Sequence, residues 1–381
     1  MNLDFTEEQV MLRDSLRSIC EAESDSKAVR QAERDPASAM AGVWRSLADA
    51  GFLGLGIAEA YGGSALGMIE TAVAAHEFGR FLVPVPHFES AFCAARLIAA
   101  AGNDEQRARW LPGIADGSLV VVPASYEAGG GDDLASVKLA LAPKDDGFSL
   151  TGQKLFVAYA AAADCLLVLV RGAGRTGEHG LACIDRRAPG VRVTAEPNLA
   201  SASLCTVDFD DVKIARGDLL GDGGAVADAW NAVFMEGLIP LAAQAVGGAE
   251  RVLEMSIAYA KEREQFDRPI GSFQSIAHYL ADAATELEAA RVLTWQAAWA
   301  HAEGLPFDRL AITAKLFACR AFRRISALAI QIHGGLGFTS EADPQLYFRR
   351  AKHQQLLHGE SGWLEKQLAR RVIDGDIPVL N

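Results

Sequence analysis

Two short segments in the last third of the 381-residue chain carry residues suited to holding a nucleotide. In the first, Arg263 stands three residues before Phe266, so a guanidinium fork for a pyrophosphate lies beside an aromatic edge for an adenine or ribose. In the second, Gly334 and Gly335 let backbone approach an anion closely and present amide groups to it. The alternative is that Arg263 makes a surface ion pair and the glycines only form a turn between helices. We favour nucleotide binding because both segments occur in one chain.

A further candidate for chemistry is Glu236, a carboxylate within the apolar stretch Phe234-Met-Glu-Gly-Leu238. An unpaired carboxylate is costly to bury, so such a position suggests a functional role. An exposed acid near the start of a helix, where it complements the helix dipole, explains the same pattern equally well. Both interpretations remain open at this point.

The elements that must position these residues change character twice along the chain. At the start, Trp44, Leu47, Ala48 and Phe52 recur at helical spacing. From about residue 119, short apolar runs alternate with polar residues, as in the segment 205–209, which is typical of half-exposed antiparallel strands. After about residue 226 the helical spacing returns.

The later helical part contains one stripe of small and apolar residues on a long helix, and such stripes pack closely in four-helix bundles. The stripe consists of Leu280, Ala283, Leu287, Ala290, Thr294 and Ala297. We therefore predict an α+β fold in three parts. They are an N-terminal α-helical domain (1–118), a middle antiparallel β-barrel or sandwich domain (119–225) and a C-terminal four-helix bundle (226–381).

The composition excludes several classes of function. The net charge of −13, from 36 basic and 49 acidic residues, is a poor match to nucleic acid. No uninterrupted apolar stretch approaches the roughly 20 residues of a membrane span, so we expect no membrane partner. The first residues lack the basic and apolar regions of a signal peptide, which favours a cytoplasmic enzyme.

The six cysteines are scattered, and none lies near a second cysteine or a histidine at the spacing of metal ligands. They are Cys20, Cys93, Cys165, Cys183, Cys205 and Cys319. This pattern is typical of buried thiols in a reducing compartment. We expect neither a disulfide nor a metal site.

The two nucleotide-binding candidates stand within longer motifs. The first is Tyr259-Ala-Lys-Glu-Arg263-Glu-Gln-Phe266-Asp-Arg-Pro269-Ile-Gly271-Ser-Phe273-Gln274, which resembles the YxxxRxQFGxPIxxFQ signature of the acyl-CoA dehydrogenase family. The second is Gln331-Ile-His-Gly334-Gly335-Leu-Gly337-Phe338-Thr-Ser-Glu341, similar to that family's QxxGGxGxxxE segment. Shorter matches earlier in the chain, such as Glu77-Phe-Gly-Arg80 and Trp110-Leu-Pro112, extend the resemblance over nearly the full length.

The resemblance implies an FAD cofactor and an acyl-CoA substrate. In the family, these two segments belong to different subunits and together hold the adenosine diphosphate part of FAD, which implies a dimer or tetramer. The residues carried over are Arg263, Phe266, Gln274, Gln331, Gly334 and Gly335. Family members remove the α-proton of an acyl-CoA with a carboxylate, pass the β-hydrogen as hydride to flavin N5, and form a trans-enoyl-CoA. Their electrons usually leave through electron-transferring flavoprotein.

The family's catalytic base is the least certain residue to place. Most members carry it as the glutamate of a Tyr-Glu-Gly-Thr segment, and ungapped counting puts His358 there; Glu360 requires a shift of two residues. Other members carry the base on the helix that opens the C-terminal domain, at the position of Gly237, next to Glu236. Three candidates therefore compete. Packing or hydrogen bonding is an alternative role for His358, and helix capping or surface exposure for Glu360.

The segments expected to face the flavin also depart from the family pattern. Tyr126 begins the stretch that matches the family's Thr-Glu-Pro-Gly loop, and Phe156 and Ala158 occupy the positions of the tryptophan and threonine of its Lys-x-Trp-Ile-Thr strand. Both threonine hydroxyls are therefore missing. The loss of a side-chain donor would change the flavin's potential or weaken its binding, unless backbone amides compensate.

These departures resemble the smaller family members that act on steroid or other bulky acyl groups in lipid degradation. In that group two unlike chains often assemble, and one of them lacks the base or part of the flavin site. Alternatives are therefore an incomplete partner subunit or a flavin monooxygenase on the same fold. Small residues near Gly248, namely Ala242, Ala243 and Ala245, could leave room for a bulky acyl group, but tight helix packing explains them better.

Overall fold

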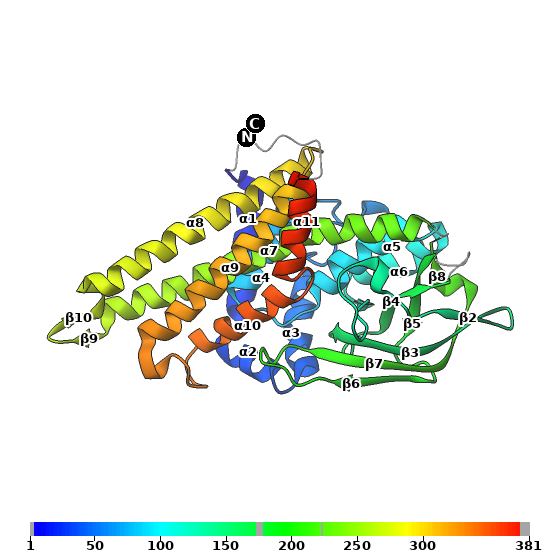
Figure 1. The fold of residues 1–381 in the computed structure, drawn as a ribbon, viewed down its shortest axis with the longest axis horizontal. Helices are drawn as coiled ribbons and strands as arrows, with labels where there is room; N and C mark the ends of the chain where they lie inside the picture. The colour runs from blue at the N-terminus through cyan, green and yellow to red at the C-terminus, as the bar shows by residue number, and fades with distance from the viewer. Residues whose placement is uncertain (1–3, 173–177, 222–223, 374–381) are drawn as a thin grey trace. The chain divides into compact units, whose positions relative to one another are not determined.

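The computed structural model describes residues 4–172, 178–221 and 224–373. Its elements follow the order of N-terminal helices, middle sheets and C-terminal helices (Figure 1), so the predicted α+β class is confirmed. The described residues form two compact units. The first contains 4–29, 68–83 and 238–373, and the second contains the described residues of 30–67 and 84–237.

The first unit is built mainly of helices, and its α8 and α9 pack along each other (Figure 1). Its helices are α1 (Glu7–Glu23), α4 (Met68–Arg80), α8 (Gln274–Ala302), α9 (Asp308–His333), α10 (Pro344–Leu356), α11 (Ser361–Ile373) and residues 238–262 of α7 (Gly224–Glu262). Of the stripe predicted on α8, five residues are buried and Leu280 is half-buried. This part of the sequence prediction is confirmed.

Glycines allow α4 and α7 to cross at very short range. A Cβ added at Gly79 would lie 1.9 Å from the Gln244 carbonyl oxygen, and one added at Gly247 would lie 1.9 Å from the His76 carbonyl oxygen. Gly248 faces the Phe322 ring in the same way, at 2.5 Å. The neighbouring alanines 242, 243 and 245 are completely buried. Tight packing is therefore the role of these small residues, and they leave no space for an acyl group.

The second unit combines short helices with two four-stranded sheets. Its helical segments are α3 (Pro36–Asp49), η1 (Glu59–Tyr61), η2 (His87–Ala94), α5 (Ala95–Ala101), α6 (Asp104–Ala115), η3 (Leu134–Ser136), η4 (Arg216–Asp218) and residues 224–237 of α7; α2 (Ser26–Ala32) crosses the division between the units. Segment η2 is a π-helix that continues directly into α5. Such wide turns are rare and frequently occur at functional sites.

The strands form the orders β1-β4-β5-β8 and β2-β3-β7-β6. The strands are β1 (Val121–Ala124), β2 (Leu141–Lys144), β3 (Gly147–Ala158), β4 (Cys165–Arg171), β5 (His179–Asp185), β6 (Val191–Ala195), β7 (Leu204–Ile214) and β8 (Leu219–Leu220). All pairs are antiparallel, as predicted, except that β1 pairs with β4 in parallel. The prediction was wrong there because β2 and β3, which join the other sheet, intervene, and so no hairpin connects β1 to β4.

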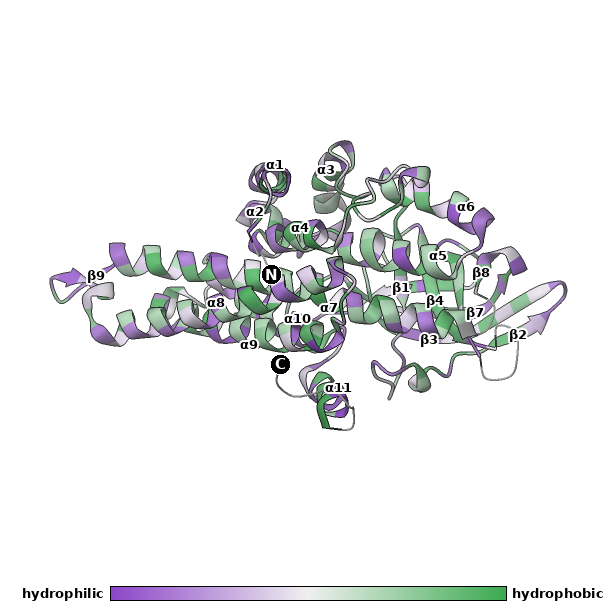
Figure 2. Cartoon of the chain, turned by 90° about the horizontal axis from the view of Figure 1, so that it is seen from above, coloured by the Kyte–Doolittle hydropathy of each residue, from purple (hydrophilic) through white to green (hydrophobic). Residues whose placement is uncertain are grey.

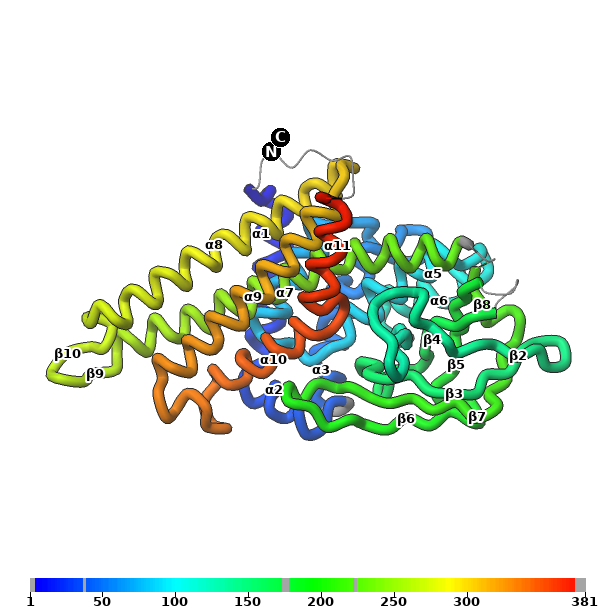
Figure 3. The backbone as a smooth tube through the Cα atoms, in the orientation of Figure 1, coloured from blue at the N-terminus to red at the C-terminus, as the bar shows by residue number. Residues whose placement is uncertain are grey.

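The long ladder between β3 and β7 is interrupted at two places. Figure 3 traces the backbone of both strands, which lie side by side. One interruption lies between Lys154 and Val157, so Leu155 and Phe156 stand outside the ladder. Phe156 adopts a positive φ of 53° and its side chain is half exposed. A bulge of this kind redirects a side chain away from the sheet.

Among the described residues, one helix, α7, is long and apolar enough to cross a membrane. The sequence expectation was wrong for this segment because it considered only uninterrupted apolar runs, whereas glycine, glutamine and glutamate interrupt α7. Of its most apolar window, 78% is buried inside the protein. The apolar character is therefore that of a core helix.

Candidate functional site

Arg263 and Phe266 lie at an exposed hairpin at the far end of the long helices. The hairpin consists of β9 (Glu264–Gln265) and β10 (Arg268–Pro269), and Figure 2 shows β9 at the hydrophilic end of the colour scale. Phe266 is 86% exposed at the tip, with a φ of 55°, and its ring meets the Phe273 ring edge to face. Because water surrounds so large an apolar ring, the hairpin offers a stacking surface to a ligand or partner.

Gly334 and Gly335 follow the end of α9, where the chain turns. Gly334 has a φ of +59°, and a Cβ at either glycine would meet no atom within 4 Å. The ring of Tyr259, from the end of α7, stacks on His333 at 4.3 Å. Within one chain, Tyr259 of the first motif and His333 of the second are therefore in contact.

These two segments fit the adenosine diphosphate part of FAD in their chemistry. An exposed guanidinium at Arg263, an exposed ring at Phe266 and open backbone at Gly334 supply what an anion and an adenine require. The amides of Gln274 and Gln331 are also exposed. Exposure of the whole set agrees with a cofactor end that a second subunit would cover.

A buried lysine shapes the segment that contains His358. The Nζ atom of Lys315, whose side chain is almost fully buried, donates hydrogen bonds of 2.9–3.0 Å to the carbonyls of Leu357, His358 and Gly359. His358 and Gly359 both adopt positive φ, at 54° and 85°. Three carbonyl oxygens therefore stabilise the buried ammonium group by hydrogen bonding, and these bonds fix the backbone of His358.

Glu360 caps the helix that follows. Its carboxylate accepts hydrogen bonds from the backbone amides of Gly362 and Trp363, at 3.0 and 2.8 Å, at the start of α11. The side chain is exposed. These bonds agree with the capping interpretation of Glu360, because they satisfy amides that the helix itself leaves without partners.

Glu236 is paired, which its sequence context did not reveal. Its Oε2 atom accepts a hydrogen bond of 2.7 Å from Arg96, and the two side chains are only 19% and 24% exposed. The Arg96 guanidinium also lies 4.9 Å from the centre of the Phe92 ring. The ion pair stabilises the carboxylate form of Glu236, so a proton transferred to Glu236 weakens its bond to Arg96.

A second carboxyl, Glu89, lies close to this pair. Burial raises the pKa of Glu89 to about 7, and only the bond from its own backbone amide opposes that rise. Burial also raises the pKa of the Cys93 thiol, and the charges of Glu89 and Glu236 add to the rise while Arg96 opposes it. All three charged groups act on the Cys93 thiol, and we refer to Glu89, Cys93, Arg96 and Glu236 as the Glu89 cluster.

The residues predicted to face the flavin lie together in the second unit. The backbone amide of Leu155 donates to the carbonyl of Tyr126, which joins the start of the 126–139 loop to the bulge that carries Phe156. Ala158 ends the same strand and pairs with Leu204. The hydroxyl of Tyr126 is engaged by Asp132 at 2.5 Å.

The same loop is anchored by a buried ion pair. Lys154, whose side chain is completely buried, donates to Glu127 at 2.6 Å and to the Ser125 carbonyl at 3.1 Å. Burial lowers the pKa of Lys154, and Glu127 only partly offsets that effect. The Glu127 carboxylate also accepts from the amides of Lys138 and Leu139. The loop therefore has a defined shape even though both family threonines are absent.

The first unit contains its own cluster of buried charges, Arg17, His76, Glu77 and Glu250, which we call the His76 cluster. His76 contacts Glu77 at 3.1 Å through Nδ1 and Glu250 at 2.8 Å through Nε2, and Arg17 binds Glu77 through two bonds of 2.9 and 2.8 Å. Burial alone would lower the pKa of His76, but the two carboxylates raise it. These contacts join α1, α4 and α7.

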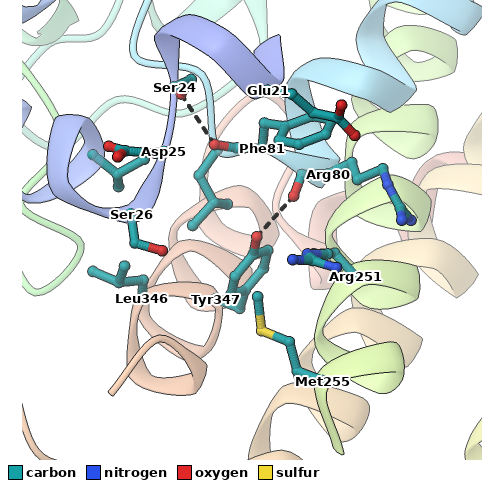
Figure 4. A pocket seen from close by; sticks show the side chains of 12 residues that line it. Glu21, Ser24, Asp25, Ser26, Arg80, Phe81, Arg251, Met255, Leu346 and Tyr347 are labelled. Atoms are coloured by element: carbon teal, nitrogen blue, oxygen red, sulfur yellow. Dashed lines mark hydrogen bonds between the residues drawn. The ribbon is translucent and has the colours of Figure 1, made fainter. Parts of the chain in front are cut away.

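Beside this cluster lies a pocket of about 270 Å³, drawn in Figure 4. Its wall includes Arg80, Arg251 and Tyr347, and the Tyr347 hydroxyl donates to the Arg80 carbonyl at 2.7 Å. Glu254 binds Arg80 at 2.6 and 2.9 Å outside the lining. Because this cation already has a carboxylate partner, the pocket is not a strong anion site.

Sequence reasoning missed Arg96, Glu89, Lys315 and the His76 cluster. Except for Arg17, which stands in the mostly polar helix α1, they show the signal that drew attention to Glu236, namely a charged residue among apolar neighbours on a helix. The signal does not distinguish a paired charge from an unpaired one, which depends on distant parts of the chain. All six cysteines are free, and five are buried. Across the described ranges, no group of three or more His, Cys, Asp or Glu side chains is placed to hold a metal.

Three family models match the chain in sequence order. They are the acyl-CoA dehydrogenase N-terminal domain over residues 6–118, the middle domain over 124–212 and the C-terminal domain over 227–373. A Bacillus subtilis (strain 168) protein named acyl-CoA dehydrogenase is 31% identical over 364 residues, which cover 94% of this chain and 96% of the relative.

Solved structures agree over nearly the whole chain. One chain, from the structure described as electron transferring flavoprotein of Acidaminococcus fermentans, has a TM-score of 0.90 at 28% identity and covers 98% of this chain and 100% of its own. Another, from the steroid ACAD named Tcur3481-Tcur3483, has a TM-score of 0.84 at 32% identity and covers 95% and 97%. These similarities extend through the helical and the sheet parts alike.

Proposed function

The chain belongs to the acyl-CoA dehydrogenase family and is an FAD-dependent acyl-CoA dehydrogenase, and from this premise we propose that it oxidises the α,β bond of a bulky or ring-bearing acyl-CoA. The product is the trans-enoyl-CoA. The observation that carries this substrate class is the 32% identity to the steroid ACAD over 95% of the chain. The small residues of α7 do not support it, because they are tightly packed and leave no wide pocket beside them.

In this proposal Glu236 removes the α-proton. Its carboxylate is held as an anion by Arg96 at 2.7 Å, in surroundings that are mostly apolar. Proton transfer to Glu236 weakens its bond to Arg96, which the Phe92 ring continues to hold in place. Arg96 is therefore a positioning residue that aims the base.

Two sets of residues would bind the cofactor. Arg263, Phe266 and the backbone at Gly334 would bind an adenosine diphosphate end, and the bulge at Phe156 with the Tyr126 loop would bind a flavin end. When bound, FAD supplies the acceptor for the β-hydrogen as hydride. The chain's own contribution is to orient the acyl group, exclude water and accept the α-proton.

For the electron acceptor we propose electron-transferring flavoprotein, in keeping with the Acidaminococcus structure that this chain resembles. A second candidate function is that of a partner chain in a heteromeric enzyme. It is favoured by the name of the steroid ACAD, which joins two designations, and by a histidine at the commonest family position for the base. In that case a second acyl-CoA-dehydrogenase-like chain completes the site.

Anaerobic titration of the purified protein tests both candidates. We expect a flavin absorbance band that a CoA thioester of a steroid side chain bleaches more completely than butyryl-CoA does. Equal bleaching by both thioesters would refute the bulky substrate class. Flavin that appears only after co-expression with a second chain would favour the partner-subunit function.

Replacing Glu236 tests the assignment of the base. Glu236→Gln should abolish bleaching while flavin binding remains, because an amide cannot accept the proton. Asp228→Asn, an exposed change on the same helix, serves as the matched control and should bleach normally. Normal bleaching by Glu236→Gln would mean that another group is the base.

A further inference from the structure

A second pocket, of about 240 Å³, opens on the His76 cluster, and the proposed function assigns no role to it. Its lining includes Trp295, and we call it the Trp295 pocket. The lining side chains come from the segment before α1 and from the helices α1, α4, α7 and α8. All these segments belong to the first unit, so the pocket lies within one compact body.

The lining of the Trp295 pocket contains more cations than carboxylates. The cations are Arg13, Arg17, His76 and Arg291, and the carboxylates are Glu77 and Glu250. His76 contacts one carboxylate through each ring nitrogen, at 3.1 and 2.8 Å, and only the imidazolium form can donate through both. In the pocket of Figure 4, by contrast, two arginines face two carboxylates, Glu21 and Asp25. An excess of positive charge therefore distinguishes the Trp295 pocket.

The guanidinium groups of the lining retain donors for a ligand. In the described part of the chain, Arg17 binds Glu77 through Nε and Nη2, at 2.9 and 2.8 Å, which leaves Nη1 available. Arg13 uses the same two nitrogens on Asp14, whose side chain is 57% exposed, so water screens that pair. Arg291 approaches Glu250 only to 3.5 Å. The internal ion pairs therefore do not exhaust these three side chains.

The positions of the arginines favour an anion between them. Arg13 and Arg17 stand four residues apart on α1, where like charges share a face and repel each other. Arg291 adds a third guanidinium to the same pocket from α8. A carboxylate would relieve the repulsion, because its two oxygens accept hydrogen bonds from planar guanidinium groups. A phosphate dianion fits less well, since Glu77 and Glu250 repel a second negative charge.

Aromatic rings form the apolar wall of the pocket. The Phe5 ring meets the Trp295 ring edge to face at 4.9 Å, and the His76 ring lies 6.3 Å from Trp295. Phe5 and Trp295 are only half-buried, so both rings keep surface for a flat apolar group. A volume of about 240 Å³ is below the roughly 300–1,000 Å³ of sites for drug-sized ligands, so a ligand with a single ring is the better match.

We propose that the Trp295 pocket binds a small aromatic carboxylate. The carboxylate group lies among Arg13, Arg17 and Arg291, and the ring packs against Trp295. This inference does not depend on the proposed dehydrogenation, because it uses other residues. A ligand held by α1 and α8 at once should also stabilise the folded protein, since it binds that state alone.

Isothermal titration calorimetry of the holoenzyme with benzoate tests the site. We expect one benzoate to bind each chain. Benzamide has the same ring without the charge, and acetate has the charge without the ring. Each should bind at least about tenfold more weakly than benzoate, because each lacks one of the two sets of contacts. Affinity of benzamide or acetate equal to that of benzoate would overturn the proposal.

Two variants locate the binding. Arg13→Gln and Arg291→Gln should each lower benzoate affinity about 10- to 100-fold, the usual range for a hydrogen bond between charged groups. Their side chains are about one-third exposed, so both variants should fold. Arg370→Gln, at an exposed site on α11, is the matched control and should bind benzoate as the wild type does.

Thermal unfolding gives an independent measurement. Benzoate should raise the Tm of the wild type and of Arg370→Gln, and at the same concentration it should raise the Tm of the two pocket variants much less. Equal benzoate affinity in all three variants would place the ligand elsewhere and overturn the site. Absence of binding to the wild type below about 10 mM benzoate would overturn it as well.

Discussion

The His76 cluster in the first unit and the Glu89 cluster in the second each contain two glutamates and an arginine, but the pKa of Glu77 and the pKa of Glu89 shift in opposite directions. In the first, hydrogen bonds from His76 and Arg17 outweigh the effect of burial and lower the pKa of Glu77 to about 2. In the second, burial raises the pKa of Glu89 to about 7. Burial acts in the same direction on both carboxyls, so the partners decide the result.

This difference separates structural charges from charges available to a ligand. Glu250 behaves as Glu77 does. Burial would raise its pKa, but His76 and nearby arginines have the larger effect and lower the pKa to about 2. A carboxylate with two partners has little capacity left for a substrate. Glu89 retains that capacity.

Breaking the His76 cluster should have the largest effect. Glu77→Gln leaves Arg17 without its buried carboxylate and His76 with Glu250 alone. It should lower the free energy of unfolding by about 3–5 kcal/mol near neutral pH, the usual cost of a broken buried ion pair. Urea denaturation followed by tryptophan fluorescence measures this change. Glu262→Gln, an exposed change on α7, is the control.

The pH dependence identifies the cause of that loss. The pKa of Glu77 is about 2 in the folded protein, against an ordinary 4.5, so its stabilisation is present above pH 4.5 and disappears as the pH falls toward 2. The deficit of Glu77→Gln should therefore shrink steadily over that interval. A deficit that stays constant down to pH 2 would show that packing, rather than charge, is the cause.

Lys315 offers an intermediate case, because its ammonium group donates to three backbone carbonyls. Lys315→Met fills the space but leaves the carbonyls of Leu357, His358 and Gly359 without their donor. We expect a loss of about 2–3 kcal/mol in the free energy of unfolding. Faster amide hydrogen exchange in residues 357–359 should accompany it, and unchanged exchange there would contradict the role assigned to Lys315.

The sequence was sufficient for features that depend on local pattern. The stripe on α8 and the alternation in β7 produced the predicted helix and strand, because burial of one face repeats with the period of the element. In both cases, neighbouring residues contain the whole physical cause. The role of the Arg263 and Gly334 motifs in binding FAD stays a prediction.

Pairing across the chain could not be predicted. Arg96 and Glu236 are 140 residues apart in the sequence, and His76 and Glu250 are 174 apart. The local sequence around each residue therefore contains no sign of its partner. The parallel pairing of β1 with β4 depends in the same way on where the intervening strands go. A local apolar context correctly marks a charge as unusual, but its meaning depends on partners that only the fold brings near.

Glu89 should show the opposite pH response to Glu77. Because its pKa is raised from 4.5 to about 7, its favourable contribution is complete below pH 4.5 and is lost as the pH rises through 7. Glu89→Gln escapes that loss, so its stability relative to wild type should increase with pH, by up to about 2 kcal/mol after allowance for partial exposure. Parallel urea titrations of both proteins at several pH values measure the difference. A constant difference between pH 5 and pH 8 would contradict the unpaired state of Glu89.

The smallest effect on the fold is expected at Phe266, which is exposed and belongs to neither cluster. Phe266→Ala removes a ring that is 86% exposed, so the free energy of unfolding without FAD should change by less than about 0.5 kcal/mol. If the ring stacks on the adenine, FAD affinity should fall about tenfold, since stacking on an aromatic ring contributes about 1–3 kcal/mol. Fluorescence titration of the apoprotein with FAD measures this loss. Tyr279→Ala, at another exposed ring of the first unit, provides the comparison, and equal FAD affinities in the two variants would remove Phe266 from the cofactor site.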